Sequence, residues 1–123
     1  MNETEGPQKE ILKSEFNEFL KVQLKKSEEI SPEEISLEQV GDLLQSTLYP
    51  MDKAIGSLEQ RAYKLGLEKM KQAMMVLGNF ISRTTAYADR VVGGGDIYEF
   101  RSHLLQLKEV LQLVDGLVNS ELK

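Results

Sequence analysis

His103 is the one histidine of this 123-residue chain, and it follows Glu99 by four residues, one turn of a helix. A carboxylate at this spacing could orient an imidazole for general acid–base catalysis. Catalysis would also need a nucleophile or a substrate site beside the pair, and the sequence offers neither. We therefore interpret His103 as a half-buried helix residue with a carboxylate neighbour, and we expect the protein not to be an enzyme.

Metal and phosphate sites are the next chemistries to consider. The chain has no cysteine, which excludes thiolate metal sites. Dimetal sites in helical bundles use Glu-x-x-His twice, whereas this chain has a single histidine. Gly93–Gly95 precedes a helix, as phosphate-binding loops do, but the glycines follow a helix and no Lys-Ser/Thr comes after them. We predict no metal ion and no cofactor.

Basic side chains raise the possibility of nucleic-acid binding. They lie roughly along one side of a predicted helix that spans residues 50–92, where they could contact phosphates. The strip consists of Arg61, Lys64, Lys71, Arg83 and Arg90. The whole chain is nevertheless acidic, with a net charge of −5, and no aromatic residues interleave with the strip to stack on bases. Nucleic-acid binding is therefore the weaker alternative.

The helices that position these residues are clearest at the C-terminal end. After Gly93–Gly95, Asp96 and Glu99 form a capping box, which predicts a helix from Ile97 to about Leu122. Its apolar residues recur in steps of three and four, the spacing of a helix packed lengthwise against others. They are Ile97, Phe100, Leu104, Leu107, Leu111, Val114 and Val118.

One long helix is predicted from Pro50 to about Val92. Unbroken, it would be about 63 Å long. Gly56, Gly66 and Gly78 each cost about 1 kcal/mol relative to Ala in a helix interior, so we expect close helix–helix contact or a kink at one of them. The final helix, folded back from the glycine turn, reaches only to about Gly66. The first two helices, or another subunit if they cannot, must then cover the remainder.

Two shorter helices precede the long one, after a predicted disordered tail at residues 1–7. The first runs from Gln8 to Glu29 with one apolar stripe, and Ser31-Pro32 makes a short turn. A capping box at Ser36 begins the second helix, which ends at Tyr49-Pro50 because the residue before proline avoids the helical region. Its predicted inner face is Leu37, Val40, Leu44 and Leu48.

The sequence as a whole predicts an all-α, antiparallel bundle of about four helices built on a long helical hairpin, with residues 8–123 as a single domain. No apolar run is long enough to cross a membrane, so we expect no membrane partner. The acidic N-terminus lacks the apolar core of a signal peptide, and the absence of cysteine fits a reducing compartment. We expect a soluble cytoplasmic protein.

Two segments hold more apolar residues than one packed stripe needs. In the stretch Ala73–Ile81 they point nearly all round the helix, and the final helix has a similar surplus. The surplus fits the centre of a four-helix core or an exposed groove for a protein partner or a second copy. We predict a non-catalytic interaction module: a small acidic adaptor or chaperone, or a self-associating subunit of a larger assembly. The candidate binding residues are Met70, Met74, Met75, Leu105, Val110, Leu113 and Leu117.

Overall fold

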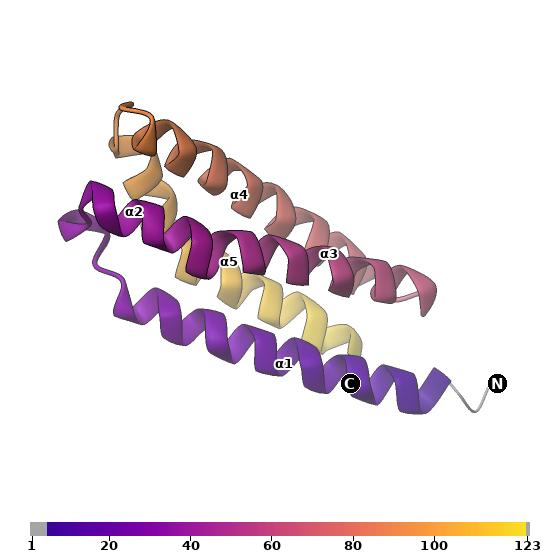
Figure 1. The fold of residues 1–123 in the computed structure, drawn as a ribbon. Helices are drawn as coiled ribbons and strands as arrows, with labels where there is room; N and C mark the ends of the chain where they lie inside the picture. The colour runs from indigo at the N-terminus through magenta and orange to yellow at the C-terminus, as the bar shows by residue number, and fades with distance from the viewer. Residues whose placement is uncertain (1–4, 123) are drawn as a thin grey trace.

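The computed structural model describes residues 5–122, and this part of the chain contains helices and no strand (Figure 1). Four helical rods form a bundle. They are α1 (Glu5–Glu29), a second rod made of α2 (Leu37–Leu43), the π-helical turn η2 (Leu44–Leu48) and α3 (Tyr49–Lys64), then α4 (Glu68–Val92) and α5 (Tyr98–Leu122). A short 3-10 turn, η1 (Pro32–Glu34), follows α1. The all-α bundle predicted from the sequence is confirmed.

Neighbouring rods run antiparallel. Side-chain pairs show this, because residue numbers rise in one helix as they fall in the other. Such pairs are Asn17–Asn119 and Glu28–Lys108 between α1 and α5, and Thr84–His103 and Met70–Glu121 between α4 and α5. Since α1 lies against both α5 and α3, the four rods close into an up-down-up-down bundle.

The predicted long helix from Pro50 to Val92 is wrong, because the chain folds back on itself midway. Gly66 has φ 71°, a left-handed conformation that glycine adopts without strain. The amide of Leu67 donates to Ala62 O at 2.9 Å and so satisfies one of the last carbonyls of α3. A Cβ at Gly78 would lie 3.4 Å from Ile55 Cγ2, which places α3 closely against α4. The first half of the predicted helix therefore covers the second half.

The predicted helix end at Tyr49-Pro50 is also wrong. The helix widens into the π turn η2, in which the amide of Tyr49 donates to Leu44 O, five residues back. Pro50 has no N–H to donate, and Lys26 Nζ of α1 instead donates to Ser46 O at 3.3 Å. The wider turn and this donor from a neighbouring helix let the rod continue through the proline.

Helix starts agree better with the sequence. The capping box at Ser36 is present in both halves, since Gln39 N donates to the Ser36 hydroxyl and Ser36 N donates to Gln39 Oε1. Leu37 is exposed, and Ile35 is buried in its place, so the predicted inner face of this helix is wrong at its first position. α1 begins at Glu5, which contradicts the predicted disorder of residues 5–7; residues 1–4 lie outside the described residues.

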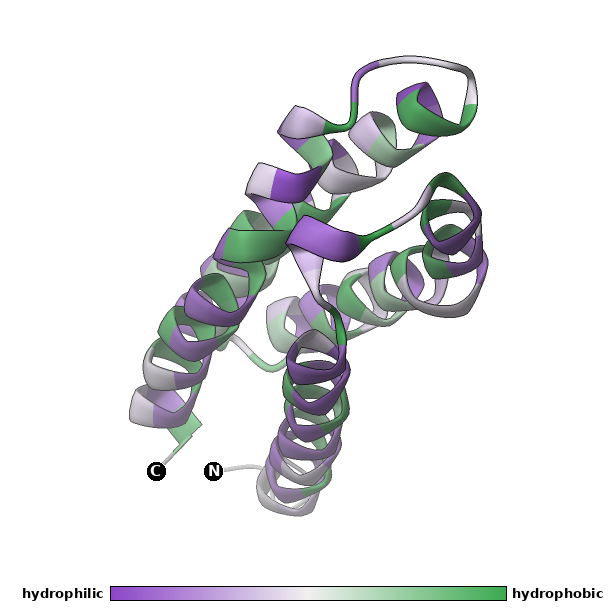
Figure 2. Cartoon of the chain, turned by 90° about the vertical axis from the view of Figure 1, so that its left-hand side faces the viewer, coloured by the Kyte–Doolittle hydropathy of each residue, from purple (hydrophilic) through white to green (hydrophobic). Residues whose placement is uncertain are grey.

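The buried apolar residues divide into two clusters. The larger one, here the main core, draws on α1, α3, the first half of α4 and the second half of α5. The smaller one, here the end core, joins Ile35 and the α2–η2 segment to the last turns of α4 and the start of α5. The predicted stripe of the final helix is buried from Phe100 to Val118, and Ile97 is half-buried. Figure 2 views the bundle from the end-core side and shows hydrophilic residues over most of α1.

The turn at Gly93–Gly95 returns the chain along α4, as predicted. Gly94 has φ 101°, and the amide of Gly95 donates to Arg90 O at 2.7 Å. At the far end, the Glu121 carboxylate accepts hydrogen bonds from the amides of Lys69 and Met70 at 3.1 and 2.8 Å. A carboxylate here satisfies otherwise unpaired N–H groups and the positive end of the α4 dipole. None of the helices between residues 5 and 122 combines the length and the hydropathy of a membrane-spanning segment.

Candidate protein-binding surface

Two of the predicted binding residues, Met70 and Met74, are fully buried in the main core, so their assignment to a surface is wrong. The reason is the turn at Gly66. α3 folds back against α4, and together with α1 and α5 it completes the main core in which these methionines are buried. Met75, Leu105, Leu113 and Leu117 are exposed, and Val110 is half-buried.

Val110, Leu113 and Leu117 lie on one stripe of α5. The stripe also includes His103 and Gln106, because all five residues follow one another in steps of three and four and so share one side of the helix. On α4, Val76, Phe80, Arg83 and Tyr87 share a side for the same reason. Neither stripe belongs to the most deeply buried side of its helix.

His103 shows that the two stripes lie on the same side of the helix pair. Its ring stacks on Phe80 with centroids 4.7 Å apart and meets the Tyr87 ring edge-on at 4.8 Å. The register set by Thr84–His103 and Met70–Glu121 then places Val76 level with Leu113. We define the outer face by its five apolar side chains: Val76, Phe80, Val110, Leu113 and Leu117.

The outer face is accessible and firmly supported. Val76 is 53% exposed, Leu113 59% and Leu117 43%, whereas Phe80 and Val110 are partly buried against the main core.

No protein-family model matches this chain, and no curated protein or solved structure matches it either. Sequence reasoning had not assigned Val76 and Phe80 to a surface, although both belong to the apolar stretch Ala73–Ile81 that signalled a surplus.

Leu105 and Met75 lie elsewhere. Leu105 shares a side of α5 with Arg101 and Lys108, whose side chains reach Ile35 O and Glu28, so it belongs to the side nearer α1. Met75 lines a shallow depression between α3 and α4 with Ile55 and Gly78. The seven predicted residues are therefore divided among the core, the outer face and two other sides.

The His103 environment favours a neutral imidazole. Burial lowers the pKa of His103 and the Arg83 charge lowers it further, while Glu99 opposes the shift. The Thr84 hydroxyl donates to Phe80 O at 2.8 Å and lies 3.1 Å from His103 Nδ1. Because that hydroxyl has one proton, Nδ1 carries its own and donates to Thr84. The imidazole thus links α4 to α5 beside the outer face.

The predicted basic strip is not continuous. The turn at Gly66 puts Arg61 and Lys64 at the end of α3 and the other three residues on α4, which runs in the opposite direction. Three of the five are also paired with carboxylates. Arg61 pairs with Glu15, Lys71 with Glu68 at 3.3 Å and Arg90 with Glu99 at 3.6 Å.

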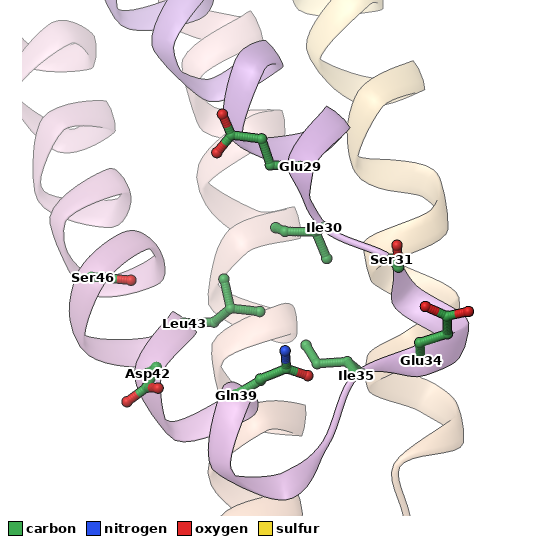
Figure 3. A pocket seen from close by; sticks show the side chains of 9 residues that line it. All are labelled: Glu29, Ile30, Ser31, Glu34, Ile35, Gln39, Asp42, Leu43 and Ser46. Atoms are coloured by element: carbon green, nitrogen blue, oxygen red, sulfur yellow. The ribbon is translucent and has the colours of Figure 1, made fainter.

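A cavity of about 360 Å³ lies where α1 gives way to η1 and α2 (Figure 3). Ile30, Ile35 and Leu43 supply its apolar lining, and its only charged lining residues are Glu29, Glu34 and Asp42. This charge repels anions such as phosphates. Within residues 5–122 no group of three His, Asp or Glu side chains is placed to hold a metal ion.

Proposed function

We propose that this protein is a non-catalytic interaction module, a helical adaptor or chaperone or a self-associating subunit, that binds protein through the outer face. The observation that carries the proposal is the set of exposed apolar side chains shared by α4 and α5. Burial of apolar surface contributes about 25 cal/mol per Å², and contiguous exposed apolar surface on a small domain marks an interaction site.

The geometry of the outer face favours a helical ligand. Val110, Leu113 and Leu117 project from α5 at the spacing by which helices dock lengthwise, and Val76 and Phe80 do so from α4. Both helices are anchored on their inner sides by the main core. The surface is therefore preorganised, which reduces the entropy lost on binding.

The absence of cysteine in the whole chain supports action in a reducing compartment. We accordingly place this function in the cytoplasm.

Two charge substitutions test the proposal. Leu113→Glu and Leu117→Glu together should abolish association, because each puts a carboxylate in the apolar contact. Leu105→Glu is the matched control, since Leu105 is on the same helix, equally exposed at 59% and away from the outer face. Circular dichroism should show all variants folded.

Association is measured in two ways. Sedimentation over a concentration series reports self-association, and a photo-crosslinking residue at position 113 or 105 reports protein partners in cells. A discrete crosslinked protein or a dimer that forms through position 113 and not 105 supports the proposal. A chain that remains monomeric and crosslinks no better from 113 than from 105 contradicts it. Binding that weakens steeply with salt would point to phosphate contacts instead.

A further inference from the structure

Two cations border the outer face on its α4 side. Lys69 and Arg83 are exposed and lie on the same side of α4 as Val76, at seven residues before and seven after it. A separation of 14 residues corresponds to about 21 Å along the helix. Within residues 5–122 neither side chain lies within 4.0 Å of a carboxylate oxygen.

Two carboxylates on the same side of the helix pair already have other partners. Glu121 accepts from the amides at the start of α4, and Glu99 pairs with Arg90. The α5 border of the outer face carries one further charge, Glu109, which precedes Leu113 by four residues. Among residues 5–122, the α4 edge of the outer face thus carries two cations that no carboxylate pairs, whereas its α5 side carries Glu99, Glu109 and Glu121, of which Glu99 and Glu121 already have partners.

We propose that the occupant of the outer face is an amphipathic helix of a partner protein whose edge toward α4 is acidic. This inference rests on the proposed function and adds the charge of the partner. Carboxylates about four turns apart on the partner helix would meet Lys69 and Arg83, while its apolar side chains cover the outer face. A second copy that stacks its α4 antiparallel on this α4 about Val76 is disfavoured, because Lys69 would lie opposite the mate's Arg83.

The test uses two designed helical peptides that differ only in charge. Both carry the same leucine stripe and span the distance from Lys69 to Arg83; one has glutamates along one edge and the other has lysines at the same positions. Each is titrated into the ¹⁵N-labelled full chain while amide shifts are recorded. We expect the glutamate peptide to shift amides around Val76 and Leu113 and to bind about tenfold more tightly than the lysine peptide, as two or more exposed charge pairs allow.

Substitutions then test whether Lys69 and Arg83 cause the preference for the glutamate peptide. Lys69→Gln with Arg83→Gln should remove most of the tenfold difference, whereas Lys53→Gln, at an exposed lysine of α3, should leave it unchanged. The preference should also fall as salt rises, because exposed charges are screened.

Several results would overturn the inference, and they separate it from the proposed function. Equal binding of both peptides at the outer face, or tighter binding of the lysine peptide, overturns the acidic partner and leaves apolar docking intact. Dimerisation that Leu113→Glu abolishes, or displacement of the peptide by duplex nucleic acid, shows a different occupant and also overturns it. If neither peptide binds at about 1 mM and position 113 crosslinks no better than position 105, both proposals fail.

Discussion

Alanine substitutions at Met74 and at Leu113 should lower the free energy of unfolding by different amounts, because Met74 lies in the main core and Leu113 on the outer face. Met74 is fully buried in the main core, so Met74→Ala removes buried atoms and leaves a cavity, at a cost of about 2–5 kcal/mol. Leu113 is 59% exposed. Since full burial of a leucine side chain contributes about 1.5–3 kcal/mol, Leu113→Ala should cost about 1 kcal/mol or less. Both residues lie within helices, where alanine is well tolerated.

Urea unfolding followed by circular dichroism measures both changes. A chain of this length has an unfolding free energy of about 6–18 kcal/mol, so both variants should remain folded in buffer. With a urea dependence of about 2 kcal/mol per M, the midpoint should fall by about 1–2.5 M for Met74→Ala and by about 0.5 M or less for Leu113→Ala. The slope should not change. Leu105→Ala should behave like Leu113→Ala, because the two leucines are equally exposed.

Two results would refute this reasoning. A loss for Leu113→Ala as large as that for Met74→Ala would mean that the outer face is covered within one copy. A loss below about 1 kcal/mol for Met74→Ala would mean that Met74 is not packed in the main core formed by α1, α3, α4 and α5.

Four further substitutions are expected to change stability in stated directions, each measured by thermal or urea unfolding. Gly56→Ala should raise the unfolding free energy by about 1 kcal/mol, since a new Cβ meets no atom within 4 Å, whereas Gly95→Ala should lower it because its Cβ would lie 2.8 Å from the Arg90 carbonyl oxygen. Glu121→Gln should cost about 1 kcal/mol, the usual effect of weakening a cap, because the amide oxygen can still accept but the negative charge is lost. An unchanged midpoint would show that this charge does not stabilise the start of α4. The lowered pKa of His103 means that the unfolded chain binds its proton first, so stability should fall as pH drops below about 6.5; His103→Gln should remove that component, and equal pH dependence in both proteins would count against it.

The final helix could be predicted because its signals agree with one another. Three glycines, an aspartate at the helix start and an uninterrupted 3-4 repeat all place the same turn and the same buried side. The predicted capping box is wrong in its second half, because Asp96 accepts from the Tyr98 amide while the Glu99 carboxylate pairs with Arg90. The return of the chain along α4 as far as Lys69 then follows from helix length alone. Local signals of this kind need no information about the rest of the fold.

The break at Gly66 could not be predicted with the same certainty. A glycine in a helical pattern is compatible with a kink, with close packing or with a full reversal, and each costs a similar local free energy. What decides among them is the apolar surface that α3 and α4 bury against each other, which is a tertiary effect. Pro50 led to the opposite error, since a helix end was predicted where the helix continues. The π turn η2 and the Lys26 side chain remove the usual penalty of a proline within a helix.

The same reversal explains the errors in the binding surface. Apolar residues that point all round α4 predicted that something must surround it, which is correct, since α3 and α5 both do so. The sequence could not show which sides of α4 would remain exposed once α3 and α5 had packed against it. Met74 became core and Val76 became surface, although both lie in one apolar stretch two residues apart.

The division into two cores has a consequence for hydrogen exchange. The Leu12–Phe16–Leu20 side of α1 contributes to the main core, whereas the end core is closed by Ile35 and the α2–η2 segment. We expect the two ends of the bundle to open separately, and the two helices that contribute to both cores, α4 and α5, to exchange their central amides last. A protein built this way can loosen the segment around Ile35 and still keep the pair α4–α5 rigid.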